Sequence, residues 1–197
     1  MSLCDSCPRF PLQKGTFSGE KYEGGYKEGK KHGRGRWRGP LRQTYDGEWN
    51  EDLRDGQGHY RTPAHEEYIG YWKDDKKNGK GAWVNPDKLC YKGEWENDKF
   101  HGYGEWLTPE AEIYEGDLDM GKRQGMGLWT GPTGHQYNGQ WDKDMKHGQG
   151  KLTAPTGEVY DGEWRKDKRQ GHGSWKSPQN DTYMGCLLYT SPSPRDS

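Results

Sequence analysis

The stretch YDGEWRKDKRQGHGSW, residues 160 to 175, holds two Trp, one Tyr and three Gly, with charged side chains between them. The same spacing recurs along the chain: a Tyr comes every 23 residues, and a Gly follows two positions after each Tyr. The tyrosines are Tyr22, Tyr45, Tyr68, Tyr91, Tyr114, Tyr137, Tyr160 and Tyr183. Self-similarity at a fixed period indicates a repeat architecture rather than one local site.

Each repeat carries two further aromatic positions. In the repeat of Tyr45 these are Trp49 and, after a Gly-x-Gly pair, Tyr60, and all 10 Trp of the chain fall at these two places. Tyr45, Gly47 and Trp49 lie at i, i+2 and i+4, so they share one face of an extended strand. Each repeat is therefore predicted to be two short strands joined by a loop, such as residues 50–55.

Turn chemistry supports this division into strands. The loop places Asp or Gly where a positive φ is easiest, at Asp52, Asp75, Asp98, Gly29 and Gly121. A proline in each following segment, such as residues 61–64, fixes φ for the turn into the next repeat. The glycines on the strands are expected to leave space for neighbouring rings.

The predicted fold is all-β: an elongated, single-sheet antiparallel meander of seven hairpins, with about fourteen strands. One hairpin alone is marginally stable, so stability is expected to come from the stacking of neighbouring repeats. Helices are not expected, because Gly and Pro interrupt every 23-residue window.

These residues resemble a known family. Tyr91-Lys92-Gly93-Glu94-Trp95, followed by His101-Gly102-Tyr103-Gly104, is similar to the MORN repeat (membrane occupation and recognition nexus), and the pattern covers residues 22–185. The resemblance implies a MORN repeat solenoid that serves as a protein-binding platform. It also implies membrane contact sites, cilia or cytoskeletal collars as places of action.

The ends of the chain depart from the repeat. Residues 1–21 are expected to be a flexible segment, with residues 15–17 as a possible capping strand. Repeats are expected over residues 22–185, one starting at each of the eight tyrosines and the last, at Tyr183, incomplete. Residues 186–197 resemble a translated sequencing adapter, so the natural protein is expected to continue differently.

Composition limits the class of protein. Only 27% of residues are hydrophobic, which favours disorder, but 10 Trp, 13 Tyr and a net charge of -1 oppose it. No run of about 18 apolar residues is present, and the N-terminus lacks the apolar region of a signal peptide. The four Cys show no disulfide-like pattern, which favours an intracellular, non-secreted protein.

Few residues suggest chemistry. Cys4-x-x-Cys7 is one half of a zinc knuckle, and no second pair exists. Four of the seven His lie within the Gly-x-Gly motif, and a repeated position is more often structural than catalytic. The sequence therefore predicts no catalytic residue, no metal site and no cofactor, and a protein that is not an enzyme.

A basic residue recurs at one position in six of the seven repeats, with Phe100 as the exception, while acidic residues recur on the first strand. The predicted basic edge consists of Lys31, Arg54, Lys77, Arg123, Lys146 and Arg169. Such a row suits anionic phospholipid or the acidic tails of tubulin. The alternative is a solvated edge that prevents aggregation. Nucleic acid is not expected, because the chain is not basic overall.

The aromatic face suggests a second surface. With nothing predicted to cover it, twist would curl this face into a groove, and exposed apolar grooves often mark binding sites. An amphipathic helix is the expected occupant. The groove residues are Tyr45, Trp49, Tyr60, Trp72, Trp95 and Trp106. The alternative is that twist and long side chains close the groove.

The function predicted from the sequence is a non-enzymatic scaffold or adaptor that binds a protein partner, expected to be helical. The expected sites are cytoplasmic, at the cytoskeleton, a cilium or a membrane, and a homodimer is possible. The alternative is an N-terminal accessory region of a truncated enzyme, such as a phosphatidylinositol phosphate kinase or a SET-domain methyltransferase.

Overall fold

Every regular element in the described part of the chain is a β-strand. The computed structural model describes residues 19–187 and divides the chain into two compact units, Met1–Pro109 and Glu110–Ser197. The predicted capping strand at residues 15–17, the pair Cys4 and Cys7, and residues 188–197 lie outside the described residues.

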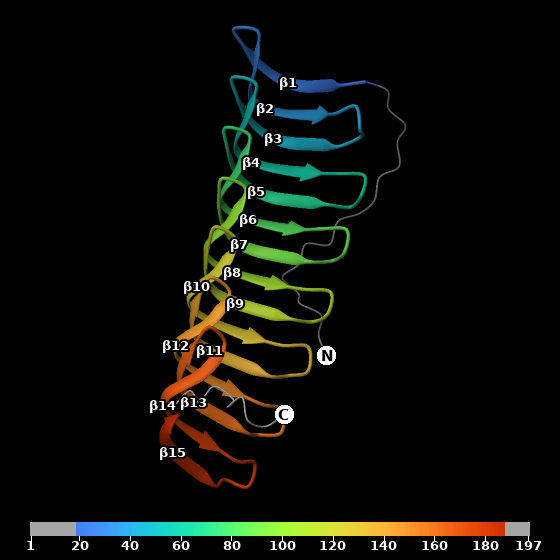
Figure 1. Ribbon diagram of the computed structural model, residues 1–197. Coiled ribbons are helices and arrows are strands. Elements are labelled where there is room, and N and C mark those ends of the chain that lie inside the picture. Colours follow the sequence, from blue (N-terminus) through green and yellow to red (C-terminus); the bar gives the residue numbers. More distant parts are fainter. Residues whose placement is uncertain (1–18, 188–197) are drawn as a thin grey trace, which may run out of the picture. The chain divides into compact units, whose positions relative to one another are not determined.

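The strands follow one another in chain order (Figure 1). The first unit holds β1 (Lys21–Lys27), β2 (Lys30–Arg38), β3 (Thr44–Asn50), β4 (Leu53–Arg61), β5 (Glu67–Lys73), β6 (Lys76–Val84), β7 (Cys90–Glu96) and β8 (Lys99–Leu107). The second holds β9 (Ile113–Asp119), β10 (Lys122–Thr130), β11 (Gln136–Asp142), β12 (Met145–Thr153), β13 (Val159–Arg165), β14 (Lys168–Lys176) and β15 (Thr182–Leu187).

Within each unit, every strand pairs antiparallel with the next one along the chain. The predicted all-β antiparallel hairpin meander is therefore confirmed. The described residues hold fifteen strands rather than about fourteen, because the incomplete eighth repeat contributes β15 (Thr182–Leu187).

The hairpin tips are tighter than predicted. Glu51 and Asp52 alone connect β3 to β4, with φ of 48° and 71°. Two consecutive positive φ values are the geometry of the type I′ turn, which matches the twist of antiparallel strands. The positive φ predicted at the tips is confirmed at Asp52, Asp75, Asp98, Gly29 and Gly121.

Each hairpin is bent beside its Gly-x-Gly pair. The pairing of β3 with β4 shifts register between Gly47 and Trp49, and Gly56 opposite this shift has a φ of +104°. Such a register irregularity increases the local twist and bends the strand. Figure 1 shows the result in both units: the tip half of each hairpin turns away from the flat half.

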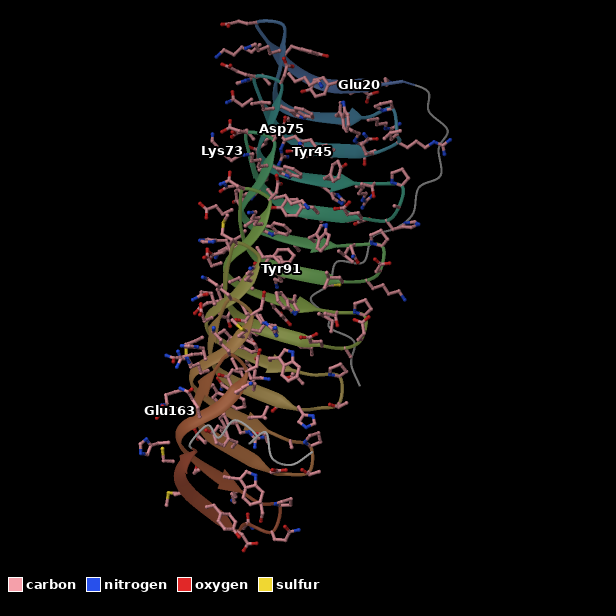
Figure 2. All side chains as sticks on the ribbon, in the orientation of Figure 1. Glu20, Tyr45, Lys73, Asp75, Tyr91 and Glu163 are labelled. Atoms are coloured by element: carbon pink, nitrogen blue, oxygen red, sulfur yellow. The ribbon has the colours of Figure 1, made fainter. Side chains whose placement is uncertain are left out.

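The core is a stack of rings on the inner side of this bend. Tyr45 and Tyr68 are fully buried, and Figure 2 shows Tyr45 and Tyr91 on the same side of the first unit's sheet. The ring of Tyr45 meets that of Trp49 at 5.1 Å and that of Trp72, from the next repeat, at 5.6 Å, both edge to face. Edge-to-face pairs at this distance are stabilising beyond their buried area, so neighbouring repeats hold each other in place.

The glycines leave room for these rings, as predicted. A Cβ added to Gly104 would lie far inside van der Waals distance of the Tyr91 hydroxyl. It would face Gly93 across the strand pair, because the two glycines are paired in register. Any side chain at this position must therefore displace the phenol or the backbone.

Candidate functional site

The first-strand rings form the core rather than an open surface. Tyr45, Trp49, Trp72 and Trp95, four of the six predicted groove residues, are at most 6% exposed. The bend folds each first-strand Trp against the tyrosines. At these four residues the aromatic groove is therefore closed, which is the alternative that the sequence left open. Direct contact of these four residues with a partner stays a prediction and would require the repeats to open.

Their polar atoms are used inside the stack. The Tyr45 hydroxyl donates to the Glu48 carbonyl at 3.0 Å, and the Trp49 Nε1–H donates to the Gly35 carbonyl at 3.1 Å. Burial raises the pKa of the Tyr137 hydroxyl to about 12, and burial also raises the pKa of the Tyr45 hydroxyl. The tyrosines are thus neutral structural donors at physiological pH.

The second-strand rings are different, because they are only half-buried. We name them the ring row. In the first unit the ring row consists of Trp37, Tyr60, Trp83 and Trp106. The corresponding positions of the second unit are Trp129, Leu152 and Trp175. Two predicted groove residues, Tyr60 and Trp106, belong to this row, so it is the part of the predicted aromatic surface that remains accessible.

Glutamates fix alternate members of the ring row, and sequence reasoning missed them. Trp37 donates its Nε1–H to Glu20 at 2.7 Å and Trp83 donates to Glu66 at 2.8 Å, and in the second unit Trp129 donates to a glutamate in the same way. The glutamates are Glu20, Glu66, Glu112 and Glu158, the last bonded to Trp175. They recur every 46 residues, twice the basic period, and a search at that period would have found them.

The predicted basic residues lie over the rings instead of forming an exposed edge. The Lys77 Nζ lies 5.1 Å from the centroid of Tyr68, 5.3 Å from that of Trp83 and 4.9 Å from that of Trp95. Its side chain is 16% exposed, and burial lowers its pKa. Cations over aromatic faces are attracted by the ring quadrupole. Lys31, Arg54, Arg123 and Lys146 are half-buried in the same way, and only Arg169 of the six is exposed.

Aspartates at the hairpin tips fix this row of cations. The Asp75 Oδ1 accepts the backbone N–H of Arg54 at 2.9 Å and its Nε–H at 2.8 Å, while the Asp75 N–H donates to the Arg54 carbonyl. The cations therefore join consecutive repeats, and their predicted binding of anionic lipid or tubulin stays a prediction.

The acidic residues of the first strands also have a local role. The Glu163 Oε1 accepts the backbone N–H of His172 at 3.1 Å, and the Asp117 Oδ2 accepts that of Met126 at 3.0 Å. Both N–H groups lie inside a Gly-x-Gly pair, next to a glycine of positive φ. These carboxylates therefore satisfy backbone donors that the bend removes from the sheet ladder.

Residues 19–187 contain no group of three or more His, Cys, Asp or Glu side chains placed to hold a metal ion. A polar hollow of about 390 Å³ in the second unit is lined by residues including His147, Glu163, Arg165 and Gln170. No membrane-spanning helix occurs in the same part of the chain.

Comparison with known protein families identifies the repeat. The MORN repeat matches seven times, at residues 22–40, 45–64, 68–88, 91–109, 114–136, 137–159 and 160–182. The chain belongs to the MORN-repeat family. The predicted family is thereby confirmed, and membership supports a non-enzymatic repeat scaffold. Comparison with curated protein sequences gives no significant match.

One solved structure shares the fold at low sequence identity, and a second is less similar. The TCP domain of SAS-4 (dCPAP) from Drosophila melanogaster, solved in complex with a proline-rich motif of Ana2 (dSTIL), is similar with a TM-score of 0.50 and 8% identity. The match covers 93% of this chain and 100% of that domain. The TCP10 domain of Danio rerio CPAP, in complex with a STIL peptide, has a TM-score of 0.41 and 12% identity, over 81% and 76% of the two chains. The likeness to the SAS-4 domain concerns the fold alone.

Proposed function

We propose that this protein is a non-catalytic scaffold whose ring row binds a segment of a partner protein. The observation that carries the proposal is the division of the aromatic residues into a buried stack and a half-buried row. The buried stack provides stability, so the ring row is not needed as core. Half-exposed Trp and Tyr at regular intervals are typical of protein-binding surfaces, where such residues dominate affinity.

The spacing of the ring row favours an extended partner. One ring comes every second strand, and strands lie about 4.8 Å apart, so successive rings are about 9.6 Å apart. A polyproline II segment has three residues per turn and a rise of about 3.1 Å, which gives a repeat of about 9.3 Å. Every third residue of a proline-rich segment crossing the strands would thus meet a ring.

A helix fits this spacing less well. Positions i and i+7 of an α-helix lie on one face and are about 10.5 Å apart, which misses the ring spacing by about 0.9 Å per repeat. The SAS-4 TCP domain, which is similar in fold, was solved in complex with a proline-rich motif, which is a precedent for a ligand of this kind. The helical partner predicted from the sequence becomes the competing result in the test below.

Membership of the MORN-repeat family also supports a proposal about where in the cell the protein acts. We propose that the scaffold acts at cytoskeletal, ciliary or membrane-associated sites, where MORN proteins are expected. The accessory region of a truncated enzyme remains the alternative, and such a region would use the ring row in the same manner.

Direct binding tests this function. The probes are fluorescein-labelled dodecaproline and a helical Ala/Glu/Lys peptide of equal length with leucines at i and i+7, measured by fluorescence anisotropy. We expect dodecaproline to bind, and Trp83→Ala to weaken binding at least tenfold, because a truncated aromatic anchor typically costs about 2 kcal/mol.

The matched control is Tyr71→Ala on the opposite face, where the phenol is 46% exposed and bonded to Gln57. This variant should bind as the wild type does. Binding of the helical peptide alone would replace the extended partner by a helix, and binding of neither peptide would overturn the proposed function.

A further inference from the structure

One repeat departs from the pattern of charges that accompanies the ring row. In the repeat that begins at Tyr91, Phe100 stands where the other six repeats have Lys or Arg. Leu89 stands where Glu66 lies one repeat earlier, at the position that binds the indole of a ring-row Trp. At these two positions the repeat therefore carries neither a cation nor a carboxylate.

Phe100 joins the rings into an apolar cluster. It stacks on Tyr91 at 3.9 Å between centroids with 21° between planes, and its ring lies 4.9 Å from that of Trp95. Its ring also lies 6.0 Å from that of Trp83 and 6.4 Å from that of Trp106, so it fills the space between two ring-row members. Phe100, Leu89, Trp83 and Trp106 are all half-buried, which leaves part of each in contact with solvent.

The neighbouring repeat shows what is missing here. Beside Trp83, the Glu66 Oε1 accepts the indole N–H and lies 3.9 Å from the Lys77 Nζ. A ligand that covers this pair must displace water from two charged groups, which is costly. A ligand that covers Phe100 and Leu89 meets no such cost.

We infer that Leu89, Phe100 and Trp106 form an apolar anchor site that receives one uncharged, apolar side chain of the partner segment and thereby sets its register along the ring row. The inference rests on the proposed function and names the partner's chemistry at one position. Anchors of this kind are typically central, aromatic and able to exclude water. The charged repeats on the N-terminal side, with Arg54 and Lys77, contact the rest of the segment and tolerate polar residues.

The test gives this repeat the charged residues of the repeats on either side of it, Glu66 with Lys77 and Glu112 with Arg123. The double variant Leu89→Glu/Phe100→Arg carries the residues that other repeats have, so it should fold with an unchanged circular dichroism spectrum. Should it fail to fold, the single variant Leu89→Gln, which copies Gln43 at the same position, takes its place. Tyr71→Ala, on the opposite face of the sheet and outside the ring row, is the matched control.

The probes are labelled dodecaproline peptides with Leu or Asp at one central position. The wild type and Tyr71→Ala should prefer the Leu peptide about tenfold or more, as expected for burying a Leu side chain. The double variant should lose that preference. An equal preference in the double variant would overturn the anchor site alone, whereas absence of binding of every peptide to the wild type would overturn the proposed function together with it.

Discussion

Trp95 and Trp83 are the same residue type on paired strands of the first unit, and the Lys77 Nζ lies at nearly the same distance from both rings. Trp95 is 4% exposed and donates to the Gly81 carbonyl, whereas Trp83 is half-buried and donates to Glu66. Trp95 lies in the tip half of its hairpin and Trp83 in the flat half. The position of a Trp relative to the bend, and not its residue type, therefore decides whether it stabilises the core or remains accessible to a partner.

Truncating each Trp in turn tests this comparison most severely. We expect Trp95→Ala to lower the free energy of unfolding by about 3–5 kcal/mol, as large-to-small changes in a core do. Trp83→Ala should cost about 1–2 kcal/mol, because it loses one hydrogen bond and a half-buried contact. Urea denaturation followed by circular dichroism measures both, and equal losses would contradict the division.

A glycine variant tests how tightly the buried rings of the core are packed. Gly104→Val places a side chain against the Tyr91 phenol, and we expect the free energy of unfolding to fall by about 1–3 kcal/mol through overpacking. Gly185→Val is the control, because a Cβ there meets nothing within 4 Å. Thermal melting should show a lower midpoint for the first variant only, and an unchanged midpoint for both would argue against the packing of tyrosine on glycine.

The smallest effect is expected at the tips. Asp75→Ala removes the acceptor of two hydrogen bonds from Arg54 and should cost about 1 kcal/mol in all, because the Asp75 side chain is 42% exposed and water weakens both bonds. Asp74→Ala is the matched control, because Asp74 and Asp75 both have positive φ, 47° and 66°, and both variants carry the same backbone strain. Thermal melting of the two variants should differ by the contribution of the bonds. Equal midpoints would show that Asp75 does not bind the repeats together.

Sequence alone predicted the repeats, the strands and the turns, because these depend on residues near one another. Tyr45, Gly47 and Trp49 do alternate on one strand, and Asp52 does adopt the positive φ expected of it. The bend could not be predicted in this way. It arises from a register shift between two strands, and the alternation rule assumes a flat strand.

Because the sequence did not reveal the bend, the predicted binding surfaces differ from those in the structure. A flat sheet would leave Trp72 and Trp95 open and place Arg54 and Lys77 along an edge, whereas the bend buries the former and lays the latter over rings. Tyr60 and Trp106 were selected on the same reasoning and are the two that remain half-buried. The glutamates of the ring row escaped because their period is double that of the tyrosines.

The cross-repeat hydrogen bonds from the tip aspartates and from the core indoles join residues 21 and 14 positions apart. Proteins dominated by such local contacts close short loops only, and they fold faster than β-proteins with distant pairings. Each repeat meets its stabilising neighbour as soon as the next hairpin has been synthesised. The chain is therefore suited to folding progressively as it leaves the ribosome, without waiting for its C-terminus.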